Sequence, residues 1–174
     1  MPEAKDLKTA IQRNIKALKL RPSVGRGTAT TTVRVRHGTT VDIEDGPWRL
    51  VADEMPGDGG NGLGPDPGVL GRAALGACIA MGYVMWAAVK DVPLDFVEVI
   101  VEADYDAAGL FGVDDSVPPG WSAMRYKATI SSPAPEEAVR ELADYADRHS
   151  SLLGSFERAV PVTRELEITA PARR

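Results

Sequence analysis

The sequence predicts an α+β fold in which antiparallel strands surround one long apolar helix. Residues 69–89 are almost entirely apolar, and Arg72 is their only charged residue. On both sides of this segment, apolar and polar residues alternate, which is typical of strands with one buried face. Short Gly- and Asp-containing turns separate the first of these stretches, so neighbouring strands are expected to run antiparallel.

The chain is predicted to begin with an amphipathic helix over residues 3–19, because four apolar residues recur there at helical spacing. These are Leu7, Ile11, Ile15 and Leu18. Pro22 and Gly25 follow and separate the helix from the strands. We expect residues 1–24 to form an arm that docks on the main domain, residues 25–170, or on a partner subunit, and residues 171–174 to form a tail.

An antiparallel meander is expected next, with strands over residues 27–36, 40–44 and 48–52. The first strand alternates, placing Val33 and Val35 on one face and Arg34 and Arg36 on the other. The segment 53–67 is rich in glycine and proline, so it is predicted to be a loop. A loop of this length either borders a site or simply connects the meander to the helix.

The apolar helix over residues 69–89 is expected to be buried all round, because it has no polar face to turn to water. Small residues lie one turn apart in it, such as Ala73 with Ala77 and Gly76 with Ala80, and would let another backbone approach closely. Its length would also permit a membrane span. Its glycines and the strand-rich remainder of the chain favour the core helix of a soluble protein instead.

The second half of the chain is predicted to contain a hairpin, two helices and a closing strand. The expected ranges are 95–106 and 121–130 for the hairpin, with a loop over 107–120 between its strands, 132–150 and 152–159 for the helices, and 161–168 for the last strand. Val97, Val99 and Val101 share the face expected to pack on the core. Ser132 and the following prolines and glutamates predict the start of the first helix.

Composition excludes several classes of function. The net charge of −5 argues against a nucleic-acid partner, and the single cysteine cannot form an internal disulfide, which fits a reducing cytoplasm. The N-terminus has no apolar leader. The sequence has no phosphate-binding loop, dinucleotide fingerprint or zinc motif, so we expect no metal and no cofactor.

Cys78 is the one residue left that could carry chemistry, and the residues alone leave two interpretations open. A cysteine on an apolar helix is usually a small hydrophobic residue, and burial makes it inert. It becomes a nucleophile only in an electropositive environment. Arg72 lies about 120° away around the helix, so an activating cation would have to come from Arg34, Arg36 or His37. The alternative for Arg34 and Arg36 is that they simply face solvent on their strand and play no part at Cys78.

The central region resembles the OsmC/Ohr family. The match comprises Gly64-Pro65-Asp66-Pro67, then Leu70 and Ala74-Leu75-Gly76-Ala77-Cys78, then Val92-Pro93-Leu94 and the valine-rich strand. Downstream, a Pro-Glu-Glu helix, His149 and Val160-Pro161-Val162 follow in the family's order. The resemblance covers residues 27–168 and agrees with the topology expected above.

This resemblance implies an OsmC-like fold, an intertwined homodimer, and thiol-dependent reduction of organic hydroperoxides. It aligns the peroxide-reactive cysteine with Cys78 and the activating arginine with Arg36, or as second choice Arg34. Two family positions are substituted: Gly68 stands where the catalytic glutamate is expected, and Ser150 where the second, resolving cysteine is expected. Without a second thiol, the family's two-cysteine cycle cannot operate.

Two functions therefore stay open at the level of sequence. In the first, the protein is a one-cysteine hydroperoxide reductase in the cytoplasm, and an external thiol regenerates Cys78. In the second, it is a non-catalytic homodimer that holds a small apolar ligand near Cys78. Neither function involves nucleic acid or a membrane. They differ in whether Cys78 is accessible and activated.

Overall fold

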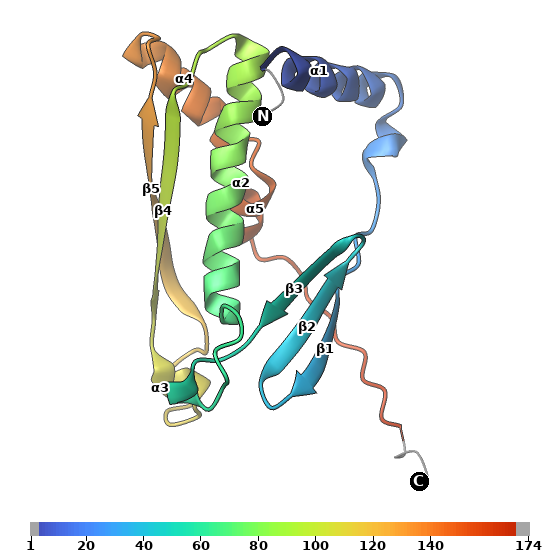
Figure 1. Cartoon of the computed structure of the whole chain (residues 1–174), viewed down its shortest axis with the longest axis vertical. Helices are drawn as coiled ribbons and strands as arrows, with labels where there is room; N and C mark the ends of the chain where they lie inside the picture. The colour runs from blue at the N-terminus through green and yellow to red at the C-terminus, as the bar shows by residue number, and fades with distance from the viewer. Residues whose placement is uncertain (1–3, 170–174) are drawn as a thin grey trace.

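The structure is a computed structural model that describes residues 4–169, with side chains from residue 6 (Figure 1). Helices and strands follow one another as an arm, a meander, a long helix, a hairpin and two shorter helices. Their bounds are α1 Ala4–Leu20, η1 Pro22–Gly25, β1 Thr32–His37, β2 Thr40–Asp45, β3 Trp48–Ala52, η2 Pro56–Asp58, α2 Pro67–Lys90, β4 Phe96–Tyr105, α3 Ala107–Leu110, β5 Trp121–Ser131, α4 Glu136–Asp147 and α5 Ser151–Phe156. The mixed, antiparallel architecture confirms the predicted α+β class.

The central helix α2 starts and ends where its sequence dictates. The Asp66 side chain accepts the Val69 N–H at 2.8 Å, and Pro67 occupies the first turn, where a missing N–H costs nothing. Asp91 ends the helix in the left-handed conformation, with φ 56°. α2 packs against β4, α4, α5 and, near its C-terminal end, α1. Lys8 of α1 forms an ion pair there with Asp91.

The hairpin β4–β5 supplies the other wall of the core. Its strands pair antiparallel from Phe96 opposite Ser131 to Tyr105 opposite Trp121. The predicted inner face of β4 is confirmed, because its valines pack against the buried cluster of Leu75, Ile79, Tyr83 and Ala146. At Gly76 an added Cβ would lie 3.2 Å from Val101 Cγ2, so glycine permits the helix to approach the strand closely.

The meander β1–β2–β3 forms a separate sheet to one side of α2 (Figure 1). β1 is shorter than expected, since it starts at Thr32 rather than at residue 27. Thr32 already pairs with Glu44, near the end of β2, and Thr31 before it reaches Asp45 only through its side chain, whose hydroxyl donates to the carboxylate at 2.6 Å. The loop after β3 contains η2, and Asp53 anchors it. This buried carboxylate accepts hydrogen bonds from the hydroxyls of Thr39 and Thr40 and from three backbone N–H groups, those of residues 54, 61 and 63.

Three sequence predictions about the later chain are wrong. The segment 107–120 is not wholly irregular, because the Asp106 side chain caps the short helix α3. α4 starts at Glu136, and Ser132 does not cap it; the Ser132 hydroxyl instead accepts the Ala134 N–H. The closing strand over 161–168 does not form. Residues 157–169 are irregular and exposed, with Ile168 86% exposed, and they pair with no strand of the described chain.

Within one chain, α2 is buried on one side only, so the expectation of burial all round is wrong for the isolated subunit. Ile79 and Tyr83 are fully enclosed, whereas Met81 is 62% exposed and Val84 46%. α2 is long and apolar enough to cross a membrane by length and composition, and 28% of its most apolar window is buried. Its outward face is therefore apolar surface that the chain itself leaves uncovered.

Candidate functional site

Cys78 lies midway along α2, partly exposed, against the corner where α4 gives way to α5. Its Sγ atom is 3.4 Å from the Ser150 hydroxyl oxygen and 3.7 Å from that of Ser151. The residue at the substituted resolving position thus lies beside the thiol. The structure brings Cys78 and Ser150 together across 72 residues of sequence.

Local hydrogen bonds explain why Ser150 is placed there. Its N–H donates to the carbonyl of Asp147 at 3.1 Å, and its side chain caps α5 by accepting the Leu153 N–H at 3.4 Å. The Asp147 carboxylate in turn accepts the Tyr126 hydroxyl at 2.7 Å, which ties the end of α4 to β5. The corner is therefore held from both sides.

Two opposing effects act on the Cys78 thiol. Burial raises its pKa, because a thiolate loses solvation. Hydrogen bonds from the Ser150 side chain, the Leu152 and Ser151 backbone N–H groups and the Ser151 side chain lower it, and together they outweigh burial, so the pKa lies below its ordinary value. The sulfur is therefore placed as an acceptor among donors, which favours the thiolate.

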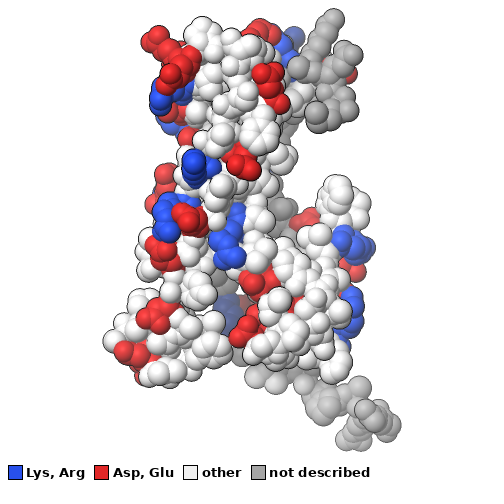
Figure 2. Space-filling view, turned by 60° about the vertical axis from the view of Figure 1, so that its left-hand side comes forward, with Lys and Arg blue, Asp and Glu red and all other residues white. Residues whose placement is uncertain are grey.

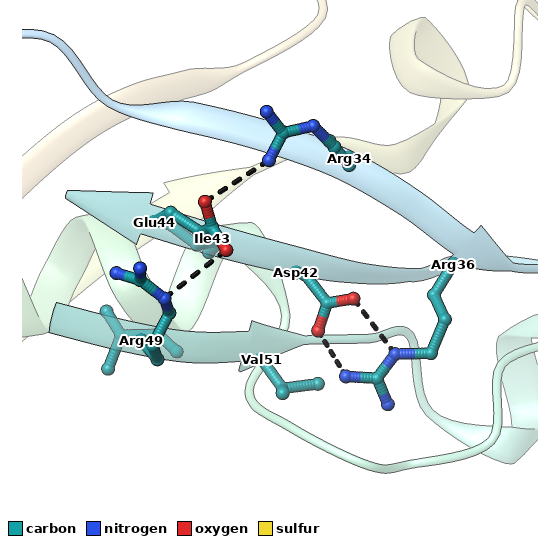
Figure 3. A pocket seen from close by; sticks show the side chains of 8 residues that line it. Arg34, Arg36, Asp42, Ile43, Glu44, Arg49 and Val51 are labelled. Carbon is teal, nitrogen blue, oxygen red and sulfur yellow. Dashed lines mark hydrogen bonds and ion pairs between the residues drawn. The ribbon is translucent and has the colours of Figure 1, made fainter.

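Arg34 and Arg36 lie on the charged face of the meander and are engaged elsewhere (Figure 3). Arg36 Nε donates to Asp42 at 3.0 Å, and this interaction lowers the pKa of Asp42 despite the opposing effect of partial burial. Arg34 Nη1 lies 3.2 Å from Glu44, whose other oxygen is 3.3 Å from Arg49 Nε. Among the residues that the structure describes, no ion pair or hydrogen bond links these arginines to Cys78. Together these side chains line a shallow cavity of about 360 Å³.

Gly68, the other substituted position, is the second residue of α2. It lies ten residues before Cys78, roughly 15 Å along the helix axis. A Cβ at this position would be 3.0 Å from Asp66 Oδ1 and 3.3 Å from Arg72 Nη1. Glycine leaves no carboxylate at this position.

A second cavity, of about 550 Å³, lies between α2, β5 and α5. Leu75, one turn before the cysteine, and Leu153 form part of its wall. Trp121 and Phe156 form another part, with ring centroids 5.9 Å apart. Gly71 allows Trp121 to lie against α2, since an added Cβ would come within 2.6 Å of the indole ring. Sequence reasoning missed this cavity, whose walls come from three elements that are far apart in the sequence, α2, β5 and α5.

A buried polar cluster beside the corner was also missed by sequence reasoning. Tyr83 is buried, and first its burial and then the charge of Asp147 raise its pKa. Burial first, then the hydrogen bond to Asp147 and the charge of that carboxylate, raise the pKa of Tyr126 to about 12. Asp147 Oδ1 is buried without a hydrogen-bond partner in the described structure. Within residues 4–169, no group of three or more His, Cys, Asp or Glu side chains could hold a metal.

These features define a small α+β protein with one hydrogen-bonded thiol at a helix corner. The chain belongs to the OsmC-like protein family, whose model matches residues 58–165, more than half of the sequence. This family has the fold of soluble proteins, and in the described chain the apolar helix α2 packs against β4, α4 and α5. No curated protein matches the sequence significantly.

Solved structures share the fold at low identity. An OsmC-like protein from Mycoplasma pneumoniae superposes with a TM-score of 0.65 at 14% identity, covering 76% of this chain and 89% of that one. An organic hydroperoxide resistance protein OsmC from Legionella pneumophila gives 0.55 at 18% identity, with coverages of 75% and 89%. An organic hydroperoxide resistance protein from Elizabethkingia anophelis gives 0.58 at 14% identity, with coverages of 77% and 91%.

Proposed function

We propose that this protein is a cytoplasmic, one-cysteine reductase of organic hydroperoxides that works as a homodimer with an external thiol. The observation that carries the proposal is the ring of hydrogen-bond donors around the Cys78 sulfur, which lowers the pKa of the thiol. Membership of the OsmC-like family and the fold shared with hydroperoxide resistance proteins support the substrate class.

The reaction needs only one protein sulfur. The Cys78 thiolate attacks one peroxide oxygen, the S–O bond forms as the O–O bond breaks, and the leaving alkoxide takes a proton to become an alcohol. The sulfur, oxidised by two electrons, is now a sulfenic acid. An external thiol displaces water from it to form a mixed disulfide, and a second external thiol releases Cys78 and leaves as the disulfide. Ser150 cannot replace these thiols, because a hydroxyl forms no disulfide.

The homodimer is proposed from the surface that one chain leaves bare. The outward side of α2 presents Ala73, Ala77, Met81 and Val84, a row of small and apolar residues at helical spacing. A second copy would cover it, in an interface well beyond the roughly 2,000 Å² at which obligate interfaces begin. It could also bring a cation to Cys78, since Arg34 and Arg36 do not reach the cysteine of their own chain.

The cavity lined by Leu75, one turn of α2 before Cys78, supports a second candidate, a non-catalytic protein that holds a small apolar ligand. Its volume of about 550 Å³ is within the range of small-molecule sites, and Leu75, Trp121, Leu153 and Phe156 give it apolar walls. In this candidate Cys78 contributes packing rather than chemistry.

Intact mass measurement separates the two functions. The reduced protein is treated with cumene hydroperoxide in the presence of dimedone, which traps a sulfenic acid. The reductase is expected to gain one dimedone adduct at Cys78 within seconds to minutes and to oxidise a small thiol catalytically, whereas Cys78→Ser does neither. If Cys78 stays unmodified while an apolar ligand quenches the fluorescence of Trp121, the protein is the binding protein instead.

A further inference from the structure

We propose that Ser150 is the positioning residue that keeps Cys78 reactive, by donating its hydroxyl hydrogen to the thiolate. This inference rests on the proposed function and assigns a role to a residue that occupies the place of a resolving cysteine. It explains how one thiol could stay nucleophilic although no cation of its own chain pairs with it in the described structure.

The direction of the Ser150 hydrogen bond follows from its neighbours. The hydroxyl oxygen already accepts the Leu153 N–H at 3.4 Å, and a hydroxyl that accepts a hydrogen bond becomes a better donor. Backbone N–H groups of Ser151 and Leu152 are also directed at the sulfur, and an N–H can only donate. The sulfur is therefore the acceptor in this corner, and the Ser150 hydroxyl, 3.4 Å away, completes the set of donors.

The backbone that carries the Ser150 hydroxyl is held in place by hydrogen bonds. The carbonyl of Asp147 fixes the Ser150 backbone at 3.1 Å, and the Ser150 carbonyl accepts the Gly154 N–H at 3.0 Å. The Tyr126 hydroxyl holds the Asp147 carboxylate at 2.7 Å, so α4 cannot slide along β5 without losing this bond. A donor that is already in place costs no reorganisation when the charged sulfur forms.

The test is the pH dependence of alkylation of Cys78 by iodoacetamide, which follows the thiolate and needs no hydroperoxide. Ser150→Ala removes both the donor and the cap of α5. Ser150→Gly also removes the donor, but glycine is tolerated at helix caps. Ser150→Thr keeps a hydroxyl. Ser155→Ala is the matched control, because it removes an exposed hydroxyl from the same helix.

We expect Ser150→Ala and Ser150→Gly to slow alkylation at pH 7 by about three- to tenfold and to move the midpoint of the profile up by roughly half to one pH unit. Ser150→Thr and Ser155→Ala should keep the original midpoint. The inference is overturned if the alkylation profiles of Ser150→Ala and Ser150→Gly match that of the original protein. It is also overturned if Ser150→Thr or Ser155→Ala shifts the profile as far as Ser150→Ala and Ser150→Gly do.

Failure of the inference and failure of the proposed function are distinguishable. A thiol whose alkylation depends on Ser150 but which does not react with cumene hydroperoxide retains the inference and refutes the reductase. A thiol that reacts with the hydroperoxide equally well with and without the Ser150 hydroxyl supports the reductase and refutes the inference about Ser150.

Discussion

The two sheets of this protein carry the same alternating pattern but have different surroundings. In the hairpin, the inner residues of β4 and β5 pack against α2, and the outer face carries ion pairs such as that of Arg125 with Glu102 and Asp104. In the meander, the charged face is likewise paired, yet Val33, Val35 and Leu50 on the opposite face are more than half exposed. Alternation predicts that one face will be covered; it does not say by which chain.

The two sides of α2 differ in the same way, because one is covered by the chain itself and the other is not. Its inward side is packed by its own chain, and its outward side and the apolar face of the meander are both bare. In the view of Figure 2 charged groups of both signs are interspersed among uncharged residues. We infer that the packed side stabilises the subunit and the bare surfaces stabilise the pair, and this division can be tested.

The largest expected effect is on the packed side. Ile79→Ala empties a position that is 1% exposed and should lower the free energy of unfolding by about 2–5 kcal/mol. Urea denaturation at several protein concentrations measures it. Leu20→Ala, which shortens a side chain that is 72% exposed on α1, serves as the control. A loss below about 1 kcal/mol for Ile79→Ala would show that the core is not where the structure places it.

The next effect concerns the bare side. Met81→Arg places a charge on the bare surface of α2. In a monomer this charge stays in water, but in the proposed dimer it would be buried, so dimer affinity should fall by about 100-fold or more. Sedimentation measures it, with Leu20→Arg, also on an exposed apolar residue, as the comparison. A stable, folded monomer of the unmodified protein at micromolar concentration would refute the dimer itself.

A smaller effect is expected at the loop that joins the meander to α2. Although burial opposes it, the hydrogen bonds to Asp53 lower its pKa to about 2 from the ordinary 3.8, so this carboxylate stabilises the fold above pH 3.8 and loses that effect as the pH falls towards 2. Asp53→Asn should be less stable at pH 7, and the difference should shrink between pH 4 and pH 2. Urea midpoints across this range measure it, with the exposed Asp58→Asn as control. A constant difference would contradict the assignment.

The smallest effect on the fold should come from Ser150→Cys, because the side chains of Ser150 and Cys78 are already in contact. Serine and cysteine are similar in size, and the 3.4 Å contact suits a disulfide after a small adjustment. We expect mild oxidation to join Cys78 to the new cysteine within one chain. Mass spectrometry after thiol alkylation decides the outcome, and two free thiols would show that the corner lacks the geometry of a disulfide.

Most of the fold could be predicted from the sequence, because periodicity and turn residues are local signals. β3 and the inner face of β4 lie where their patterns placed them. The failures share a cause. The segment around Ile168 alternates like a strand but has no neighbour in the described chain, and α2 is apolar all round but covered on one side. Both patterns describe an environment that a single chain does not contain.

The site was less predictable. The resemblance led to Cys78 and Ser150, and the structure places them in contact. Spacing alone could not have done so, because 72 residues separate them. Spacing also gave no sign of the buried polar cluster of Tyr83, Tyr126 and Asp147. These residues come from three elements, and each looks in the sequence like an ordinary core or helix-end residue. The activation of Cys78 by Arg36 or Arg34 stays a prediction, because in the described chain neither arginine is bonded to the cysteine and a role there would depend on a second chain.

The route of the chain between its two tethers has a consequence for the kinetics of assembly. The meander is joined to one end of α2 through α1 and the Lys8–Asp91 pair, and to the other end through the Asp53 loop, whose Asp53 N–H donates to Pro65 at 3.3 Å. These attachments lie roughly 36 Å apart along the 24-residue helix. The two tethers hold the bare faces of α2 and the meander within one subunit, and in the proposed dimer a second copy covers those faces in a bimolecular step. Refolding should therefore show a phase whose rate increases with protein concentration.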